Sequence, residues 1–207
     1  TAALATATMD LGPQVTANDI YPGAKVVKPI HVTGGCREGA TTCTPINTDI
    51  TVTPNINSDV FKTDITWKLY KSDQPITCRN VIVPVAQAPD NTTTPNSTTT
   101  EIRYTQNSTC KLGTVTDTTT DDEFKALTDV DFDSMTALIS GDVNELSEMI
   151  TVYGSANNKT DDYYYLVVSY ADNGNQDAQQ DKNFTIDISF GASTTINTDR
   201  DYGNTTP

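Results

Sequence analysis

Residues 60–70 read Val60-Phe-Lys-Thr-Asp-Ile-Thr-Trp-Lys-Leu-Tyr70, and this stretch gives the clearest indication of the fold. Apolar and polar side chains alternate along it, one set being Ile65, Trp67 and Leu69 and the other Asp64, Thr66 and Lys68. A period of two residues is typical of a β-strand with one buried face. We therefore predict a strand over 60–70. Because the neighbours of Trp67 on its face are aliphatic, we place this tryptophan in a core between two sheets rather than on a sugar-binding surface.

Further short strands are expected on both sides of this stretch. Alternating or β-rich runs bounded by turn residues occupy 24–32, 49–53, 81–85, 101–105, 146–153, 162–171 and 183–190. Pro29 removes one ladder donor, so the run containing it is expected at a sheet edge or a bulge. Thr120 and Glu123 form a capping-box pattern that predicts one short helix. The spacing predicts an all-β fold, an Ig-like or jelly-roll antiparallel β-sandwich forming a single body over residues 14–207.

The first eleven residues, Thr1-Ala-Ala-Leu-Ala-Thr-Ala-Thr-Met-Asp-Leu11, also alternate. One face is apolar throughout and the other is mostly polar, the first being Ala3, Ala5, Ala7, Met9 and Leu11 and the second Ala2, Leu4, Thr6, Thr8 and Asp10. Gly12-Pro13 then interrupts regular structure, which makes residues 1–13 a distinct segment. Two interpretations stay open: an ordinary first strand of the chain's own sheet, or a donor strand given to a neighbouring subunit.

Composition excludes several classes of partner. The 207 residues include 13 basic and 27 acidic side chains, for a net charge of −14. Such a surface repels phosphate backbones, so we expect no nucleic-acid partner. No run approaches the roughly 18 apolar residues that span a bilayer, so we expect no membrane insertion. The chain has no initiator Met, and we expect a processed, mature form.

Four cysteines and six Asn-x-Ser/Thr sequons point to an oxidising, extracellular location. We predict the disulfides Cys36–Cys43 and Cys78–Cys110, because each pair is nearest in sequence and encloses a polar loop. N-linked glycans are expected, with no other cofactor. The segment 88–100 reads as a polar glycosylated surface loop. The sequons are Asn91, Asn96, Asn107, Asn158, Asn183 and Asn204.

The sequence carries no recognisable catalytic constellation. Its one histidine, His31, has no G-x-S-x-G or H-E-x-x-H partner, and no phosphate-binding glycine loop precedes a helix. We therefore expect no catalytic residues and no enzyme. Asp129, Asp131 and Asp133 resemble the start of a calcium loop but lack its sixth-position Gly and twelfth-position Glu. A solvated acidic turn and a calcium site both stay open there, and no metal ligands are assigned.

Three segments together resemble a known family. They are Thr1-Ala-Ala-Leu-Ala-Thr-Ala, Ile20-Tyr-Pro-Gly-Ala-Lys-Val, and Asp172-Asn-Gly-Asn-Gln with Phe184-Thr-Ile-Asp-Ile-Ser-Phe190. They are similar to the TasA/camelysin family of secreted bacterial biofilm-fibre subunits and to their archaeal bundling-pilin relatives. The Thr/Asn composition, sequons and cysteines look still more like thread filament subunits of thermoacidophilic archaea. Some camelysin relatives are labelled peptidases, which no metal-ligand set here supports.

The resemblance implies a subunit of an extracellular surface filament, polymerised head to tail by donor-strand complementation and serving adhesion or biofilm formation. Its partners would be identical subunits and other cells or surfaces. A strand of eleven residues at ~3.3 Å each reaches about 36 Å, enough to cross a sandwich. Burying several hundred Å2 of apolar surface would contribute on the order of 10 kcal/mol before ordering costs. The alternative is a monomeric secreted adhesion or carbohydrate-binding module of a cell-surface layer.

Overall fold

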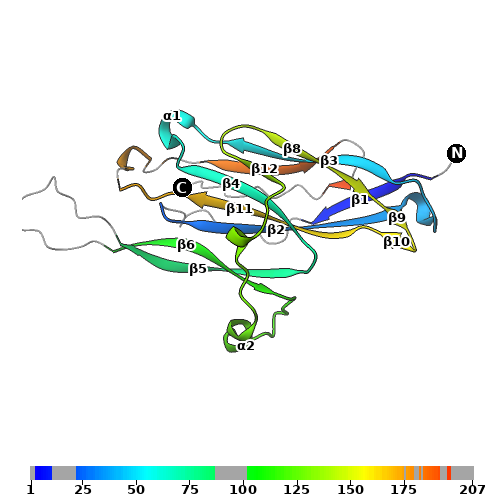
Figure 1. Ribbon diagram of the computed structural model, residues 1–207, viewed down its shortest axis with the longest axis horizontal. Coiled ribbons are helices and arrows are strands. Elements are labelled where there is room, and N and C mark those ends of the chain that lie inside the picture. Colours follow the sequence, from blue (N-terminus) through cyan, green and yellow to red (C-terminus); the bar gives the residue numbers. More distant parts are fainter. Residues whose placement is uncertain are drawn as a thin grey trace, which may run out of the picture.

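The protein is an all-β sandwich, as predicted, in which one large sheet packs against a smaller one (Figure 1). The computed structural model describes residues 3–10, 22–86, 102–174, 176–179, 182, 184–191 and 195–196. Within the described residues, no helix has the length and apolar character needed to cross a bilayer.

The large sheet has eight strands and is built around β2. Its main path runs β13 (Thr195–Ile196), β1 (Ala5–Asp10), β2 (Lys25–Cys36), β11 (Asp161–Tyr170), β4 (Ile65–Ser72) and β7 (Ile139–Gly141). A long hairpin, β5 (Ile76–Ala86) and β6 (Ile102–Leu112), joins the sheet through β6, which pairs with β2. The pairing in the large sheet is antiparallel except at two places, where β1 pairs with β13, and β2 with β6, in parallel.

The smaller sheet is antiparallel, with β3 (Ile46–Asn55) between β12 (Thr185–Phe190) and β8 (Leu146–Val152). A short pair, β9 (Gly154–Ser155) and β10 (Asn158–Lys159), follows β8. The helices are α1 (Ser58–Phe61) and α2 (Asp121–Ala126), with 3-10 turns η2 (Arg37–Gly39), η3 (Phe132–Ser134) and η4 (Asp177–Gln179). The predicted capping box at α2 is confirmed, because Thr120 and Glu123 each bond the other's backbone N–H.

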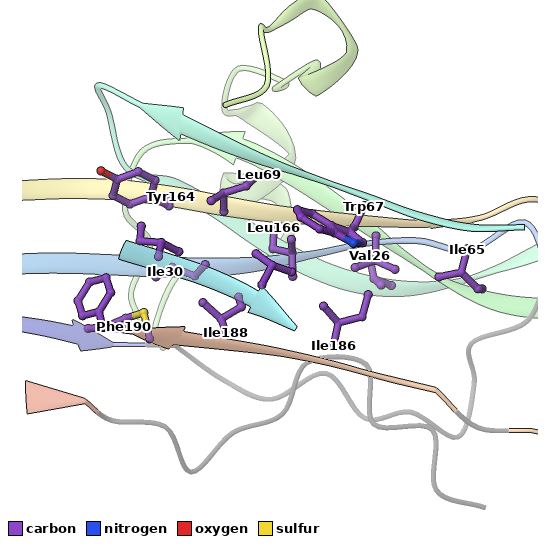
Figure 2. Close-up of a cluster of buried hydrophobic side chains, with 14 of the residues drawn as sticks. Val26, Ile30, Ile65, Trp67, Leu69, Tyr164, Leu166, Ile186, Ile188 and Phe190 are labelled. Carbon is purple, nitrogen blue, oxygen red and sulfur yellow. The ribbon is translucent and has the colours of Figure 1, made fainter. Parts of the chain in front are cut away.

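The core lies between the two sheets, and Figure 2 shows its side chains projecting into that space from both layers. Trp67 is 1% exposed there, as predicted, and its Nε1–H donates to the Asp142 carbonyl at 3.0 Å. Leu166 of β11 and Ile186 of β12 are fully buried in the same cluster. Large aliphatic and aromatic groups on alternate positions of each strand thus supply the main apolar burial.

The predicted strand over 60–70 was wrong at its beginning, since β4 starts at Ile65. Asn57 caps α1 by accepting from the Asp59 N–H at 3.0 Å, so Val60 and Phe61 lie in a helical turn. Asp64 was assigned to the polar face, yet it is 8% exposed. Its carboxylate accepts hydrogen bonds from the side-chain amides of residues far away in sequence: Asn173, Gln176 and Gln179. Those amide donors compensate its burial.

The large sheet is covered on its outer face as well. Tyr165 and Val167 of β11 pack there against Phe132 of η3 and the hairpin base at Ile76. The Tyr165 hydroxyl accepts from the Ile76 N–H at 2.6 Å. Strand β11 is therefore buried on both sides, which explains why residues 164–168 form a continuous buried run instead of alternating.

Pro29 lies where the edge of β2 changes partner. Strand β1 pairs with β2 over residues 31–36, whereas β6 meets it at Lys25. Among the described residues, no strand pairs with 26–30 on that edge. The expectation that the run containing Pro29 lies at a sheet edge was wrong, because β2 pairs with β11 on one side and with β1 and β6 on the other. The missing N–H of Pro29 falls instead in the interval between β1 and β6.

Burial makes this fold sensitive to alkali. Burial raises the pKa of Tyr165 to about 12, partly opposed by the hydrogen bond from Ile76, and it also raises the pKa of Tyr70, Tyr164 and Tyr170. A tyrosine whose pKa is higher in the folded than in the unfolded protein stabilises the fold fully below the unfolded pKa, near 10. That stabilisation is lost as the pH rises toward 12. We expect the free energy of unfolding to fall steeply above pH ~10.

Urea unfolding at pH 7 to 12, with tyrosinate absorbance, measures this loss. Tyr165→Phe should give a shallower alkaline slope, while losing roughly 1 kcal/mol at neutral pH with its hydrogen bond. Tyr153→Phe is the matched control, since Tyr153 is exposed. An unchanged slope in Tyr165→Phe would contradict the assignment.

Candidate functional site

The N-terminal strand lies in its own chain's sheet in this structure. Strand β1 runs antiparallel to β2, from Ala5 opposite Cys36 to Asp10 opposite His31. The first of the two open interpretations thus describes the conformation seen, and donation to a neighbour stays a prediction. The predicted alternation is confirmed: Ala5, Ala7 and Met9 are buried, whereas Leu4 and Thr8 are exposed. Ala3 is half-buried, and Leu11 lies outside the described residues.

Strand β1 occupies a position with hydrogen-bonding partners on both edges, which we call the strand slot. Residues 31–36 of β2 form one wall. At the N-terminal end, Thr44 forms the other wall, because Ala5 N–H donates to its carbonyl and its N–H donates to the Ala3 carbonyl, both at 2.9 Å. At the other end β13 takes over, pairing with residues 8–9. On this edge, β1 therefore pairs with two separate segments, Thr44 and β13.

The floor of the slot is closely packed. A Cβ at Gly34, which lies opposite Ala7, would sit 2.0 Å from the Tyr153 carbonyl oxygen. A Cβ at Gly154 would sit 2.0 Å from the Gly35 carbonyl oxygen. These contacts leave no room for side chains on the glycines and fit the small residues of β1. Met9 is the one long side chain that β1 places in the main core cluster.

Both predicted disulfides are present. Cys36–Cys43 closes the loop that carries η2, with a Cα–Cα distance of 5.6 Å. Cys78–Cys110 joins directly opposite residues of β5 and β6, with a Cα–Cα distance of 4.1 Å. The first disulfide borders the strand slot and the second lies in the cluster on the outer face.

Two of the six predicted glycosylation sites lie within the described residues. Asn158 is exposed in β10, and Asn107 is half-buried in β6 opposite Val81. The remaining sequons, together with the predicted loop 88–100, lie outside the described residues: Asn91, Asn96, Asn183 and Asn204.

In the acidic turn after α2, each of the three carboxylates contacts a different partner. Asp129 pairs with Lys111 at 2.6 Å, Asp133 pairs with Lys25 at 3.2 Å, and Asp131 accepts from the Asp133 N–H. Across the part of the chain that the structure describes, no group of three His, Cys, Asp or Glu side chains is placed to hold a metal ion. The calcium alternative therefore gains no support from geometry.

His31 contacts two neighbours on the outer face of the large sheet. Its Nε2 lies 2.5 Å from Asp161 Oδ1, and its ring stacks on Tyr163 at 4.6 Å.

Sequence reasoning missed the far wall of the slot. Thr44 follows a cysteine in a stretch with no alternation, and its contact with Leu4 bridges forty positions of chain. The Gly34-Gly35 pair was a signal for the packed floor of the slot, because adjacent glycines inside a strand indicate close backbone approach, but it does not identify Thr44. Comparison with protein-family models, with curated proteins and with solved structures found no match to this chain.

The buried face of β1 can be tested in the full chain. Ala7→Asp would place a carboxylate at a fully buried position, so we expect the free energy of unfolding to fall by roughly 3 kcal/mol or more. Thr8→Asp changes the neighbouring exposed position and should alter it by less than about 0.5 kcal/mol. Urea denaturation of both variants provides the comparison, and equal effects would show that β1 is not seated as described.

Glycopeptide mapping of protein from its native source tests the modification. We expect an attached glycan at Asn158, whose side chain is exposed next to the β9–β10 turn. Asn158→Gln should remove that glycan without lowering the melting temperature, because the side chain is exposed. An unmodified Asn158 in such protein would contradict the prediction.

Proposed function

We propose that this chain is a structural subunit of an extracellular surface filament, in which β1 of one copy enters the strand slot of the next. The observation that carries the proposal is the slot itself, in which a separate strand is held on both edges by β2, Thr44 and β13. A strand of identical sequence from a second copy would make the same hydrogen bonds and bury the same Ala7 and Met9 side chains. Exchange therefore conserves most of the stabilising contacts.

The connection between β1 and β2 supports exchange. Asp10 lies opposite His31, yet β2 begins six residues earlier, at Lys25. An antiparallel pair can be joined by a turn of about two residues. Here the connecting segment 11–24, of about 14 residues, could extend about 46 Å at ~3.3 Å per residue. The interval from His31 back to Lys25 is about 20 Å at ~3.3 Å per residue. The surplus length allows β1 to reach another molecule.

Exchange in this geometry would give an open polymer. The donating strand and the receiving slot are different surfaces of the same chain, so a contact between two copies leaves one strand and one slot unused. A heterologous contact of this kind continues as a filament unless its rotation closes a ring. The conformation described here, with the slot filled by its own strand, would be the unassembled state.

The remaining properties fit an exterior structural protein. Two disulfides suit an oxidising compartment, and a net charge of −14 discourages nonspecific association. We place the subunit outside the cell, carrying N-linked glycans and supporting adhesion or biofilm formation, with no catalytic role. The partners are identical subunits and other cells or surfaces.

One observation favours a second candidate, a monomeric adhesion module of a cell-surface layer. The slot is already filled by its own strand, so the chain satisfies this part of the sheet without a partner. Carbohydrate binding by stacking on the single tryptophan receives no support, since Trp67 is fully buried.

A mixing experiment separates the two candidates. Thr8 lies directly opposite Thr33 across β1 and β2, at a spacing of about 5 Å that a disulfide can bridge. Thr8→Cys and Thr33→Cys are prepared as single variants with different tags and mixed under oxidising conditions. If strands are exchanged, non-reducing gels should show a covalent pair carrying both tags, and negative-stain microscopy should show filaments.

The double variant T8C/T33C is the control, because its disulfide forms within one chain when each strand stays in its own slot. A mixture that yields no covalent pair, from a protein that remains monomeric at all concentrations, would favour the adhesion module and exclude the filament subunit.

A further inference from the structure

We propose that the Cys36–Cys43 disulfide is a clasp that holds the N-terminal end of the strand in its slot, so that breaking this bond releases the strand. In its application to a neighbour's strand, this inference rests on the proposed function. Its basis is the geometry at residues 3–5 and 36–44, which belongs to the single chain.

The segment 36–44 contacts the strand from both edges. Cys36 lies opposite Ala5 on the β2 side, and the Arg37 N–H donates to the Leu4 carbonyl at 3.2 Å. On the other edge Thr44 exchanges hydrogen bonds with Ala3 and Ala5. One short loop therefore turns around the end of β1 and supplies both walls at this level. The disulfide joins these two walls directly, through residues 36 and 43.

The bond crosses the buried face of the strand. Residues directly opposite in an antiparallel pair project to the same side of the sheet, so the side chains of Cys36 and Ala5 share a face. Ala5 is 3% exposed. The disulfide therefore spans the floor beneath the strand end, where an alanine leaves space for it.

The Cys43 side of the clasp is bonded to β9. The Cys43 N–H donates to Ser155 Oγ at 3.0 Å, and the Ser155 hydroxyl donates back to the Cys43 carbonyl at 3.2 Å. A Cβ at Gly154 would sit 2.8 Å from Cys43 Sγ, so the sulfur lies tight against this strand. The clasp thus ties the slot walls to the body through β9, at the end of the molecule where β1 begins (Figure 1).

The second disulfide provides an internal comparison. Cys78–Cys110 lies on the hairpin, in the outer-face cluster with Val27 and Tyr165, and β1 pairs with neither of its strands. Its loss should loosen the hairpin base without changing the slot. The two bonds therefore differ in location within one chain while sharing the same chemistry.

Release requires a reductant. A dithiol reagent transfers two electrons and two protons to the disulfide, giving the Cys36 and Cys43 thiols, while the reagent becomes a cyclic disulfide. Both cysteines are half-buried, so the bond is partly accessible. After cleavage, the loop backbone is the one short covalent connection between the Thr44 wall and β2, and this wall is otherwise held by hydrogen bonds such as those between Cys43 and Ser155. The strand end can then separate from it.

Amide hydrogen exchange of the full chain, read by mass spectrometry, tests the clasp. C36S/C43S, C78S/C110S and the unsubstituted chain are compared as monomers at low concentration. We expect the amides of residues 4–9 to exchange on the order of tenfold faster in C36S/C43S and at an unchanged rate in C78S/C110S. Peptides from β3 and β8 should retain their protection in C36S/C43S, showing that the body is still folded.

Equal exchange of residues 4–9 in C36S/C43S and the unsubstituted chain would overturn the clasp, whatever the state of assembly. If C36S/C43S loses protection throughout, a brief dithiothreitol pulse on the folded native chain gives the deciding reading. Selective acceleration at residues 4–9 supports the clasp, and loss of protection everywhere overturns it. If residues 4–9 alone exchange faster but the mixing experiment yields no covalent pair carrying both tags, the clasp stands and the filament subunit is rejected.

Discussion

The pairing of β2 with β11 is the interaction on which the rest of the structure depends. These strands stay in register from Lys25–Ser169 to Thr33–Asp161, the longest ladder within the large sheet's main path. One edge of β2 is fully paired with β11, so β1 and β6 both pair with the other edge. That second edge is divided at Pro29 between β1 and β6. The slot and the hairpin are consequences of this division, since neither strand can take the whole edge.

Much of the fold follows from short-range pattern, and the errors share one cause. The alternation around Trp67 predicted its face correctly, and the capping box at Thr120 predicted α2, because both signals are local. Asp64 was misplaced because its amide partners lie more than a hundred positions away. Two-sided burial of β11 also depends on distant elements, namely η3 and the hairpin base. The burial of Asp64 and of β11 is determined by tertiary packing, which no short stretch of sequence shows.

The candidate site was partly predictable for the same reason. The period of two in the first eleven residues identified the buried face, and the cysteine spacing identified both bonds. The sequence could not show what faces the strand's outer edge, because Thr44 and β13 are brought there by the fold. Nor could it decide which molecule supplies the strand, since intramolecular and intermolecular pairing use the same hydrogen bonds.

Met9 has a consequence for how any strand can sit in the slot. A slip by two residues keeps the same face inward but moves this long side chain to the position of Ala7, opposite Gly34 and beside the Tyr153 backbone. A slip by one residue turns Thr8 inward and Met9 to solvent. One alignment is therefore favoured over its neighbours. In a polymer built this way, every junction would have the same geometry, and the repeat distance would be uniform along the fibre.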